Sequence, residues 1–193
     1  RLGALAGELV LDAYRDQLSQ ARELLARGDV PAALETLEAL LAAKPDHGQA
    51  LIALGDARLT MREPDRALDA YERALQKRGN DPSALVGAGL ALVELGRYEG
   101  ALAPLARAIA DAGGDRGILA DAYRGLGVAW RRRGDLAKAI RELRKAVVED
   151  GEDASARAAL GEALVADGGS LEEALRHLER AAAGEHPPAL ALY

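Results

Sequence analysis

Apolar residues recur along the chain at spacings of three and four positions, which places them on one face of an α-helix. One run shows the spacing clearly: Leu34, Leu37, Leu40 and Leu41. Alternation of apolar and polar residues, the mark of a half-buried strand, is nearly absent. Ala, Leu, Glu and Arg, which favour helices, dominate the composition. The sequence therefore predicts an all-α protein.

Small residues repeat at a regular interval within this helical pattern. Four glycines lie in apolar segments, with 34 positions between the first two and between the last two: Gly55, Gly89, Gly127 and Gly161. Alanines follow about twelve residues later, at Ala67, Ala101, Ala139 and Ala174, and again seven residues further on, at Ala74, Ala108, Ala146 and Ala181. Two helices approach closely only where such small residues meet. The interval therefore predicts a repeated pair of helices.

This register resembles that of the tetratricopeptide repeat family, which has Leu-Gly at positions seven and eight, Ala at twenty and twenty-seven, and Pro at thirty-two. Five units carry the match: 14–47 with Ala21, Leu24, Gly28, Ala33, Leu37, Leu40 and Pro45; 48–81 with Leu51, Leu54, Gly55, Ala67, Tyr71 and Ala74; 82–115 with Leu85, Gly89, Leu92, Gly96, Ala101, Leu105 and Ala108; 120–153 with Tyr123, Leu126, Gly127, Trp130, Gly134, Ala139, Leu143 and Ala146; and 154–188 with Leu160, Gly161, Leu164, Ala174, Leu178 and Ala181. We call these units repeats one to five. The resemblance implies a right-handed α-α superhelical solenoid of antiparallel helix pairs.

Several segments depart from the repeat pattern. Residues 1–13 form either a capping helix or an extension of the first helix of repeat one, and the lack of a helix breaker favours the extension. Residues 116–119 are inserted before repeat four and predict a lengthened first helix or a kink. Repeat five carries an extra glycine and resembles the related Sel1-like repeat. Residues 189–193 are expected to begin a truncated sixth repeat.

A glycine ends the first helix of most repeats, because this position takes a left-handed backbone conformation that favours glycine. These residues are Gly28, Gly96 and Gly134. Repeat two has Arg62 at this position, followed by Pro64 and Asp65. Its turn is therefore expected to form by different chemistry.

The resemblance also implies a partner-binding surface. In the family, the first helices line a concave groove, and positions 2, 5, 9, 12 and 13 of each repeat face it. The candidate residues are Leu18, Arg22, Leu25, Ile52, Asp56, Leu59, Val86, Leu90, Val93, Glu94, Arg124, Val128, Arg131 and Arg132, with Gln49, Asp121, Ser155, Glu162 and Val165 beside them. Such a surface suits an amphipathic helix or an extended peptide. The alternative is that some of the aliphatic residues are core between repeats.

Arg131, Arg132 and Arg133 form the only basic run in the sequence. Guanidinium groups pair well with carboxylates, so the run is a candidate for binding acidic groups of a ligand. The alternative is a solvated helix end, where cations are favourable in any case. The carboxylate clamp of chaperone-binding members needs Lys and Asn at groove positions, where this chain has Leu18, Arg22 and Ala53. That mode of binding is excluded.

Composition and motifs favour binding over catalysis. The histidines show no metal-ligand spacing, there is no cysteine, and no serine lies in a nucleophile-elbow motif. A structural or surface role is expected for His47, His177 and His186. The formal charge of -6 argues against a nucleic-acid partner, and no apolar run is long enough to insert into a membrane. We therefore expect no enzyme activity, no cofactor and no metal.

The sequence thus predicts a protein-interaction adaptor or scaffold that binds another protein, as a peptide or helix, in its groove. Two alternatives remain: a scaffold that forms homo-oligomers through its ends or convex face, and a regulatory module of an enzyme outside this sequence. The excess of Arg over Lys, with abundant Ala and Gly, is typical of high-GC bacterial genomes. The cytoplasm is the expected compartment, or the periplasm if a signal segment was removed.

Overall fold

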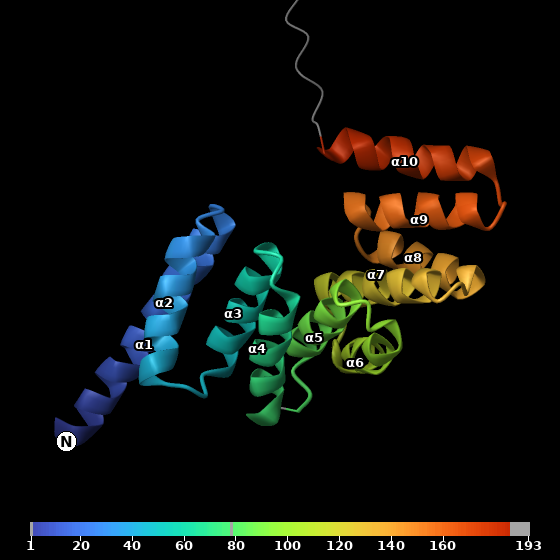
Figure 1. The fold of residues 1–193 in the computed structure, drawn as a ribbon. Helices are drawn as coiled ribbons and strands as arrows, with labels where there is room; N and C mark the ends of the chain where they lie inside the picture. Colours follow the sequence, from blue (N-terminus) through green and yellow to red (C-terminus); the bar gives the residue numbers. More distant parts are fainter. Residues whose placement is uncertain (1, 78, 186–193) are drawn as a thin grey trace, which may run out of the picture. The chain divides into compact units, whose positions relative to one another are not determined.

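The computed structural model describes residues 2–77 and 79–185, which form helices and turns with no strand among them. The helices, shown in Figure 1, are α1 (Leu2–Ala26), α2 (Val30–Ala43), α3 (Gly48–Thr60), α4 (Pro64–Lys77), α5 (Pro82–Glu94), α6 (Tyr98–Asp111), α7 (Arg116–Arg132), α8 (Leu136–Glu149), α9 (Ala154–Ala166) and α10 (Leu171–Glu185). The all-α class predicted from the sequence is confirmed.

Several helices joined by short turns pack in pairs, and the chain divides into two compact units, residues 1–91 and 92–193. In the first unit, α1 packs on α2 and α3 packs on α4; α3 also contacts α1 and α2. In the second, α7 packs on α8 and α9 packs on α10; α7 also contacts α6 and α9, and α8 contacts α9. First helices of neighbouring repeats therefore pack side by side within each compact unit.

Polar side chains at the helix starts fix where several helices begin. Aspartates at several of these starts accept hydrogen bonds from backbone N–H groups of the first turn: Asp29, Asp81, Asp115, Asp135 and Asp153. These N–H groups have no partner inside the helix, so a carboxylate at the cap satisfies them. α3 begins differently, because Nδ1 of His47 accepts the N–H of Ala50 at 3.2 Å.

The turn of repeat two has the same backbone geometry as the glycine turns. Arg62 has a φ of 60°, close to the 79° of Gly28. The N–H of Arg62 bonds to the carbonyl of Leu59 at 2.9 Å, and the N–H of Gly28 bonds to that of Leu25 at 3.0 Å. The expectation of a different turn chemistry was therefore wrong. An arginine takes the left-handed conformation here because the same backbone hydrogen bonds close the helix.

Tyr71 of α4 forms the centre of the core in the first compact unit. Its side chain is completely buried, and its ring lies against the backbones of Gly55 in α3 and Gly87 in α5. A Cβ atom built at Gly55 would lie 2.5 Å from Cε1 and Cζ of Tyr71. One aromatic ring therefore fills the space that two glycines leave open, in two successive repeats.

Leucines fill the equivalent space in the second compact unit. Leu143 and Leu160 are completely buried and belong to one core cluster with Ile140 and Leu164. A Cβ atom at Gly161 would lie 2.6 Å from Cγ of Leu178. Three glycines of the register read from the sequence, Gly55, Gly127 and Gly161, thus lie where a side chain of the paired helix fills the space of a Cβ atom.

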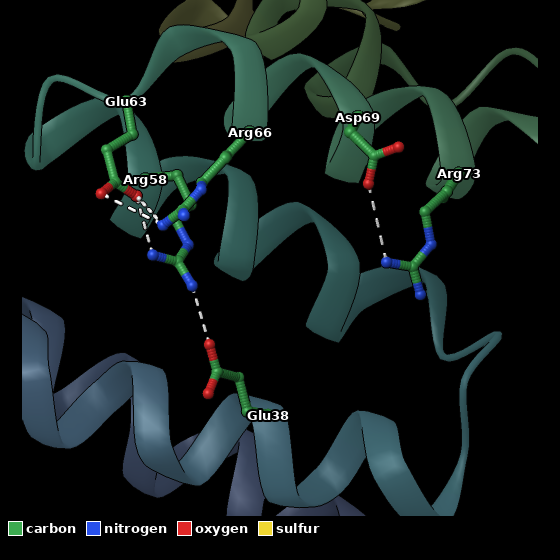
Figure 2. Close-up of polar contacts among 6 residues, drawn as sticks. All are labelled: Glu38, Arg58, Glu63, Arg66, Asp69 and Arg73. Atoms are coloured by element: carbon green, nitrogen blue, oxygen red, sulfur yellow. Dashed lines mark hydrogen bonds and ion pairs between the residues drawn. The ribbon is translucent and has the colours of Figure 1, made fainter.

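Ion pairs also join neighbouring repeats. Figure 2 shows Arg58 of α3 between two carboxylates: Nη2 lies 2.7 Å from Oε1 of Glu38 on α2, and Nη1 lies 2.7 Å from Oε2 of Glu63. Hydrogen bonding from Arg58 holds the pKa of Glu63 below its usual value. Because only 17% of the Arg58 side chain is exposed, its contact with Glu38 is partly shielded from solvent.

The segments outside the repeat pattern have the following structure. Residues 2–13 and the first helix of repeat one form the single continuous helix α1. α7 begins at Arg116, so residues 116–119 lengthen the first helix of repeat four. His186 and residues 189–193 lie outside the described residues, and the Sel1-like character of repeat five stays a prediction.

Candidate partner-binding surface

The candidate aliphatic residues divide by exposure. Leu18, Ile52 and Val86 are buried, with exposed fractions of 8%, 7% and 6%. The others are half-buried: Leu25, Leu59, Leu90, Val93 and Val128. The three buried residues thus contribute mainly to packing. This agrees with the alternative that some of the aliphatic candidates are core between repeats. The half-buried set supplies the accessible apolar surface of the first helices.

Polar candidates on the first helices are more accessible and link one helix to the next. The following are exposed: Arg22, Asp56, Glu94, Arg132, Gln49, Ser155 and Glu162. The aliphatic Val165 is exposed as well, at 53%. Arg124, Arg131 and Asp121 are half-buried. We call the exposed and half-buried members of the predicted set the first-helix surface, and describe it separately for each compact unit.

A chain of polar contacts crosses the first-helix surface of the first compact unit. Nη2 of Arg22 on α1 donates to Oε1 of Gln49 on α3 at 2.6 Å. Nε2 of Gln49 in turn donates to Oδ2 of Asp81 at 3.4 Å. Asp81 caps the start of α5 by accepting the N–H groups of Ser83 and Ala84. These contacts hold polar groups of three successive first helices in fixed relative positions.

Asp56 joins this surface to the core. Its Oδ1 accepts the hydroxyl hydrogen of Tyr71 at 2.6 Å, which satisfies the polar end of a fully buried ring. This candidate carboxylate therefore also stabilises the core.

A cavity of about 350 Å³ lies beside the polar chain. Its described lining comprises Lys44, Asp46, His47, Gly48, Gln49, Ile52, Ala74 and Asp81. Burial, followed by the nearby charge of Lys44, holds the pKa of His47 below its usual value. A neutral imidazole is also what the cap of α3 requires, because Nδ1 must carry a free lone pair to accept an N–H. Ile52 supplies the cavity with an apolar side chain among hydrogen-bonding groups.

Ion pairs dominate the first-helix surface of the second compact unit. Arg124 of α7 pairs with Asp121 at 2.6 Å and with Asp153, the cap of α9, at 3.2 Å. Arg131 pairs with Glu162 of α9 at 2.5 Å. These arginines therefore connect the first helices of repeats four and five.

The basic run at the end of α7 is only partly available to a ligand. Arg133 pairs with Glu99 at 2.7 Å and lies over the ring of Trp130, which Lys138 also approaches, 4.2 Å from the ring centre. Arg131 is paired as above. Arg132 is accessible and pairs with no carboxylate among the described residues. Of the run, Arg132 is the residue best placed to meet an acidic group.

The pairing between repeats was missed by the sequence reasoning, which treated each charge by its position within one repeat. The signal was present: Arg131 lies in the first helix of one repeat and Glu162 in the first helix of the next. Opposite charges separated by about one repeat length are neighbours when first helices pack side by side. Reading charges across repeats would have found these pairs.

The described residues contain no group of three or more His, Asp and Glu side chains arranged to hold a metal ion. Of the helices in 2–77 and 79–185, none is both long and apolar enough to cross a bilayer.

Comparison with known proteins places these features in a family. The model of the tetratricopeptide repeat family matches residues 18–60, 52–116, 120–154 and 131–189. No curated protein matches the chain in sequence.

Solved structures share the fold. A thermophilic tetratricopeptide repeat protein of Thermus thermophilus is 24% identical, with a TM-score of 0.75 over 92% of this chain and 93% of that one. PilF of Pseudomonas aeruginosa is 22% identical, with a TM-score of 0.76 over 90% and 77% of the two chains. MamA from Desulfovibrio magneticus, from residue 41 to its end, is 26% identical, with a TM-score of 0.68 over 90% and 94%. With family-model matches across most of its length and the helix pairs described above, the chain belongs to the tetratricopeptide repeat family.

Proposed function

We propose that the chain is a protein-interaction scaffold whose first-helix surface binds a segment of a partner protein. The observation that carries the proposal is the polar chain from Arg22 through Gln49 to Asp81 beside the cavity at His47 and Ile52. Groups already held in place lose little conformational freedom on binding, so such a surface is suited to recognition.

The chemistry of the surface favours a peptide or helix as the bound segment. In the first compact unit, half-buried Leu59 and Leu90 offer apolar contact, and exposed Asp56 adds negative charge beside Leu59. A segment with apolar anchors and basic flanking residues complements this part of the surface. In the second compact unit, Arg132 would meet an acidic residue instead.

Site-specific photo-crosslinking in extracts of the source cell is the first test. A crosslinker at position 59, on the first-helix surface, should capture a discrete partner. The same crosslinker at exposed position 72 on α4 is the matched control. The proposal predicts capture at position 59 and little at position 72.

Calorimetry with the purified partner is the second test. Leu59→Glu and Gln49→Ala should each weaken binding about tenfold or more, because one places a charge in an apolar contact and the other removes the centre of the polar chain. Glu72→Gln should leave affinity unchanged. A confirmed partner that binds both first-helix variants as tightly as the unmodified protein contradicts the proposal.

Self-association is a second candidate function, favoured by one observation. Leu171 and Leu175 lie one turn apart on α10 with 64% and 48% of their surface exposed. Analytical ultracentrifugation across a concentration series should show association that Leu171→Ser with Leu175→Ser removes, while Val148→Ser on α8 does not. A protein that stays monomeric at the highest concentration rules this candidate out.

A further inference from the structure

Repeat five contains a cluster of basic side chains outside the first-helix surface. Arg157 of α9 and Arg176, His177 and Arg180 of α10 line a cavity of about 220 Å³ together with Glu173. We call these four basic residues the repeat-five basic pocket. α9 and α10 pack against each other within the second compact unit, so one helix pair supplies the described lining of the pocket.

Arg157 is a charged residue at a position that holds Leu or Tyr in repeats two to four. The repeat register aligns it with Leu51 and Leu85, which are almost completely buried, and with Tyr123. Arg157 is itself only 8% exposed. Its guanidinium donates from Nε to the carbonyl oxygen of Gly151 at 2.6 Å, and it makes no ion pair with a described residue. A buried cation with only a carbonyl partner is costly, so an anion beside it is favoured.

In repeat four, the equivalent positions hold two cations whose charge is balanced by a carboxylate. There the buried Glu142 accepts hydrogen bonds from Arg141 and Lys145, each at 2.8 Å. Burial alone would raise the pKa of Glu142, but those hydrogen bonds outweigh it and hold the pKa below its usual value. Lys145 also lies 5.0 Å from the ring centre of Tyr123. One carboxylate therefore serves two cations beside a neutral ring.

Repeat five keeps the cations of repeat four and lacks the carboxylate. With one extra glycine in its turn, Arg176 aligns with Arg141, Arg180 with Lys145, and His177 with Glu142. Arg157 adds a third guanidinium where repeat four has Tyr123. Arg176 and Arg180 form no ion pair with a described residue.

His177 completes the evidence that the pocket lacks a partner of its own. Its Nδ1 is buried and has no hydrogen-bond partner among the described residues. Burial holds the pKa of His177 below its usual value; Glu173 on α10 opposes this, while Arg157, Arg176 and Arg180 reinforce it. Glu173 is already engaged by Arg144 of α8, through two contacts of 2.9 and 3.1 Å. Three cations and an unpartnered imidazole nitrogen therefore share a cavity with one committed carboxylate.

We propose that the repeat-five basic pocket binds a phosphate-type dianion, whose oxygens take the place that the Glu142 carboxylate holds in repeat four. A single carboxylate satisfies two cations there, and the third cation here favours a doubly charged group. The phosphate can be free or carried on a side chain of a peptide. This inference is independent of the first-helix surface, because none of its residues belongs to that surface.

Titration with inorganic phosphate, followed by NMR at constant ionic strength with chloride as reference, tests the proposal. Backbone amide signals of α10 should shift with saturation, and the pKa of His177 should rise as the anion neutralises its surroundings. Arg176→Gln with Arg180→Gln should weaken binding about tenfold or more. Arg66→Gln on α4, far along the sequence, should leave it unchanged.

His177→Glu is the sharpest variant, because it rebuilds the carboxylate of repeat four inside the pocket. The variant should fold at least as stably as the unmodified protein and lose phosphate binding, while His177→Gln, which adds no charge, retains part of it. Absence of saturable shifts in the unmodified protein, or equal shifts in the His177→Glu variant, overturns the proposal.

A second titration distinguishes the two sources of phosphate. A phosphoserine peptide is compared with its unphosphorylated form and with inorganic phosphate. Tighter binding of the phosphopeptide than of inorganic phosphate supports a peptide-borne group, and equal binding supports a free anion. Binding of the unphosphorylated peptide at the same site with the same affinity contradicts recognition of phosphate.

Discussion

At the residue scale, backbone conformation and close packing impose different demands on single positions. Gly28 and Arg62 occupy equivalent turns with positive φ, although only glycine adopts that conformation without a steric penalty. Gly55 has the opposite reason for being small, since the ring of Tyr71 fills the space that a side chain would need. Glycine is thus required for two separate reasons within one repeat pattern: a positive φ at one position and close packing at another.

Replacement of Arg62 by glycine should stabilise the protein. Relief of the left-handed strain is worth about 1 kcal/mol, after the larger entropy of glycine in the unfolded chain is subtracted. Urea unfolding measures the change. Gly28→Ala, where nothing lies within 4 Å of the added Cβ, should cost a similar amount for the reciprocal reason. A loss of stability in Arg62→Gly would show that the arginine side chain contributes more than the backbone strain costs.

Replacement of Gly55 by alanine should destabilise the protein by about 1–3 kcal/mol, because the added methyl overlaps a ring that has no room to move. Thermal unfolding followed by circular dichroism detects the loss. Gly100→Ala is the matched control: its Cβ would meet Leu92 at an ordinary 3.9 Å, so helix propensity should make it neutral or slightly stabilising. Equal effects of the two substitutions would contradict the close-packing interpretation.

At the element scale, the side chain that caps a helix can also shape the surface beside it. His47 caps α3, lines the cavity near Gln49 and has a lowered pKa. The cap exists only while the imidazole is neutral, so the start of α3 and the shape of the cavity both respond to protonation.

The pH dependence of stability follows from the direction of that pKa shift. A histidine whose folded pKa is lowered binds fewer protons in the folded state, so its contribution is complete above about pH 6.5 and declines as pH falls through the folded pKa. His47→Asn keeps a capping side chain and removes the titration. Urea unfolding between about pH 8 and pH 5.5 should show a smaller loss of stability in this variant. His177, with the same direction of shift, contributes equally to both proteins, and identical pH profiles would contradict the cap's role.

At the scale of the whole molecule, stability is expected to be divided between compact units. Residues 1–91 and 92–193 each hold their own buried core, centred on Tyr71 in one and on Leu143 and Leu160 in the other. Repeat proteins derive their stability from individual repeats and from the contacts between adjacent ones. Damage to one core should therefore act mainly within its own unit.

Leu160→Ala tests this division. Truncation of a fully buried leucine should cost about 2–5 kcal/mol. Hydrogen exchange measured by mass spectrometry should show lost protection concentrated in α9 and α10, with α1 to α4 retaining most of theirs. A uniform loss of protection across the chain would mean that the two units unfold as one.

The sequence by itself determined the helical class, the repeat register and several glycines at tight helix contacts, because these depend on local spacing and on residue size. Gly55 and Gly161 were identified from their interval alone, and each lies against a side chain of the paired helix, the buried Tyr71 and the half-buried Leu178. The first-helix surface followed from register together with the family resemblance, and its use in binding stays a proposal.

Only the tertiary structure decided which of the candidate residues are accessible and which charges are already paired. Leu18, Ile52 and Val86 satisfy the same positional pattern as Leu59, yet packing buries them. Arg131 is unpaired when its own repeat is considered alone, but in the structure it forms an ion pair with Glu162 of the next repeat. The basic pocket of repeat five likewise emerged from comparison of two packed helix pairs. Exposure and charge pairing depend on neighbours distant in sequence, whereas helix periodicity is a property of each segment alone.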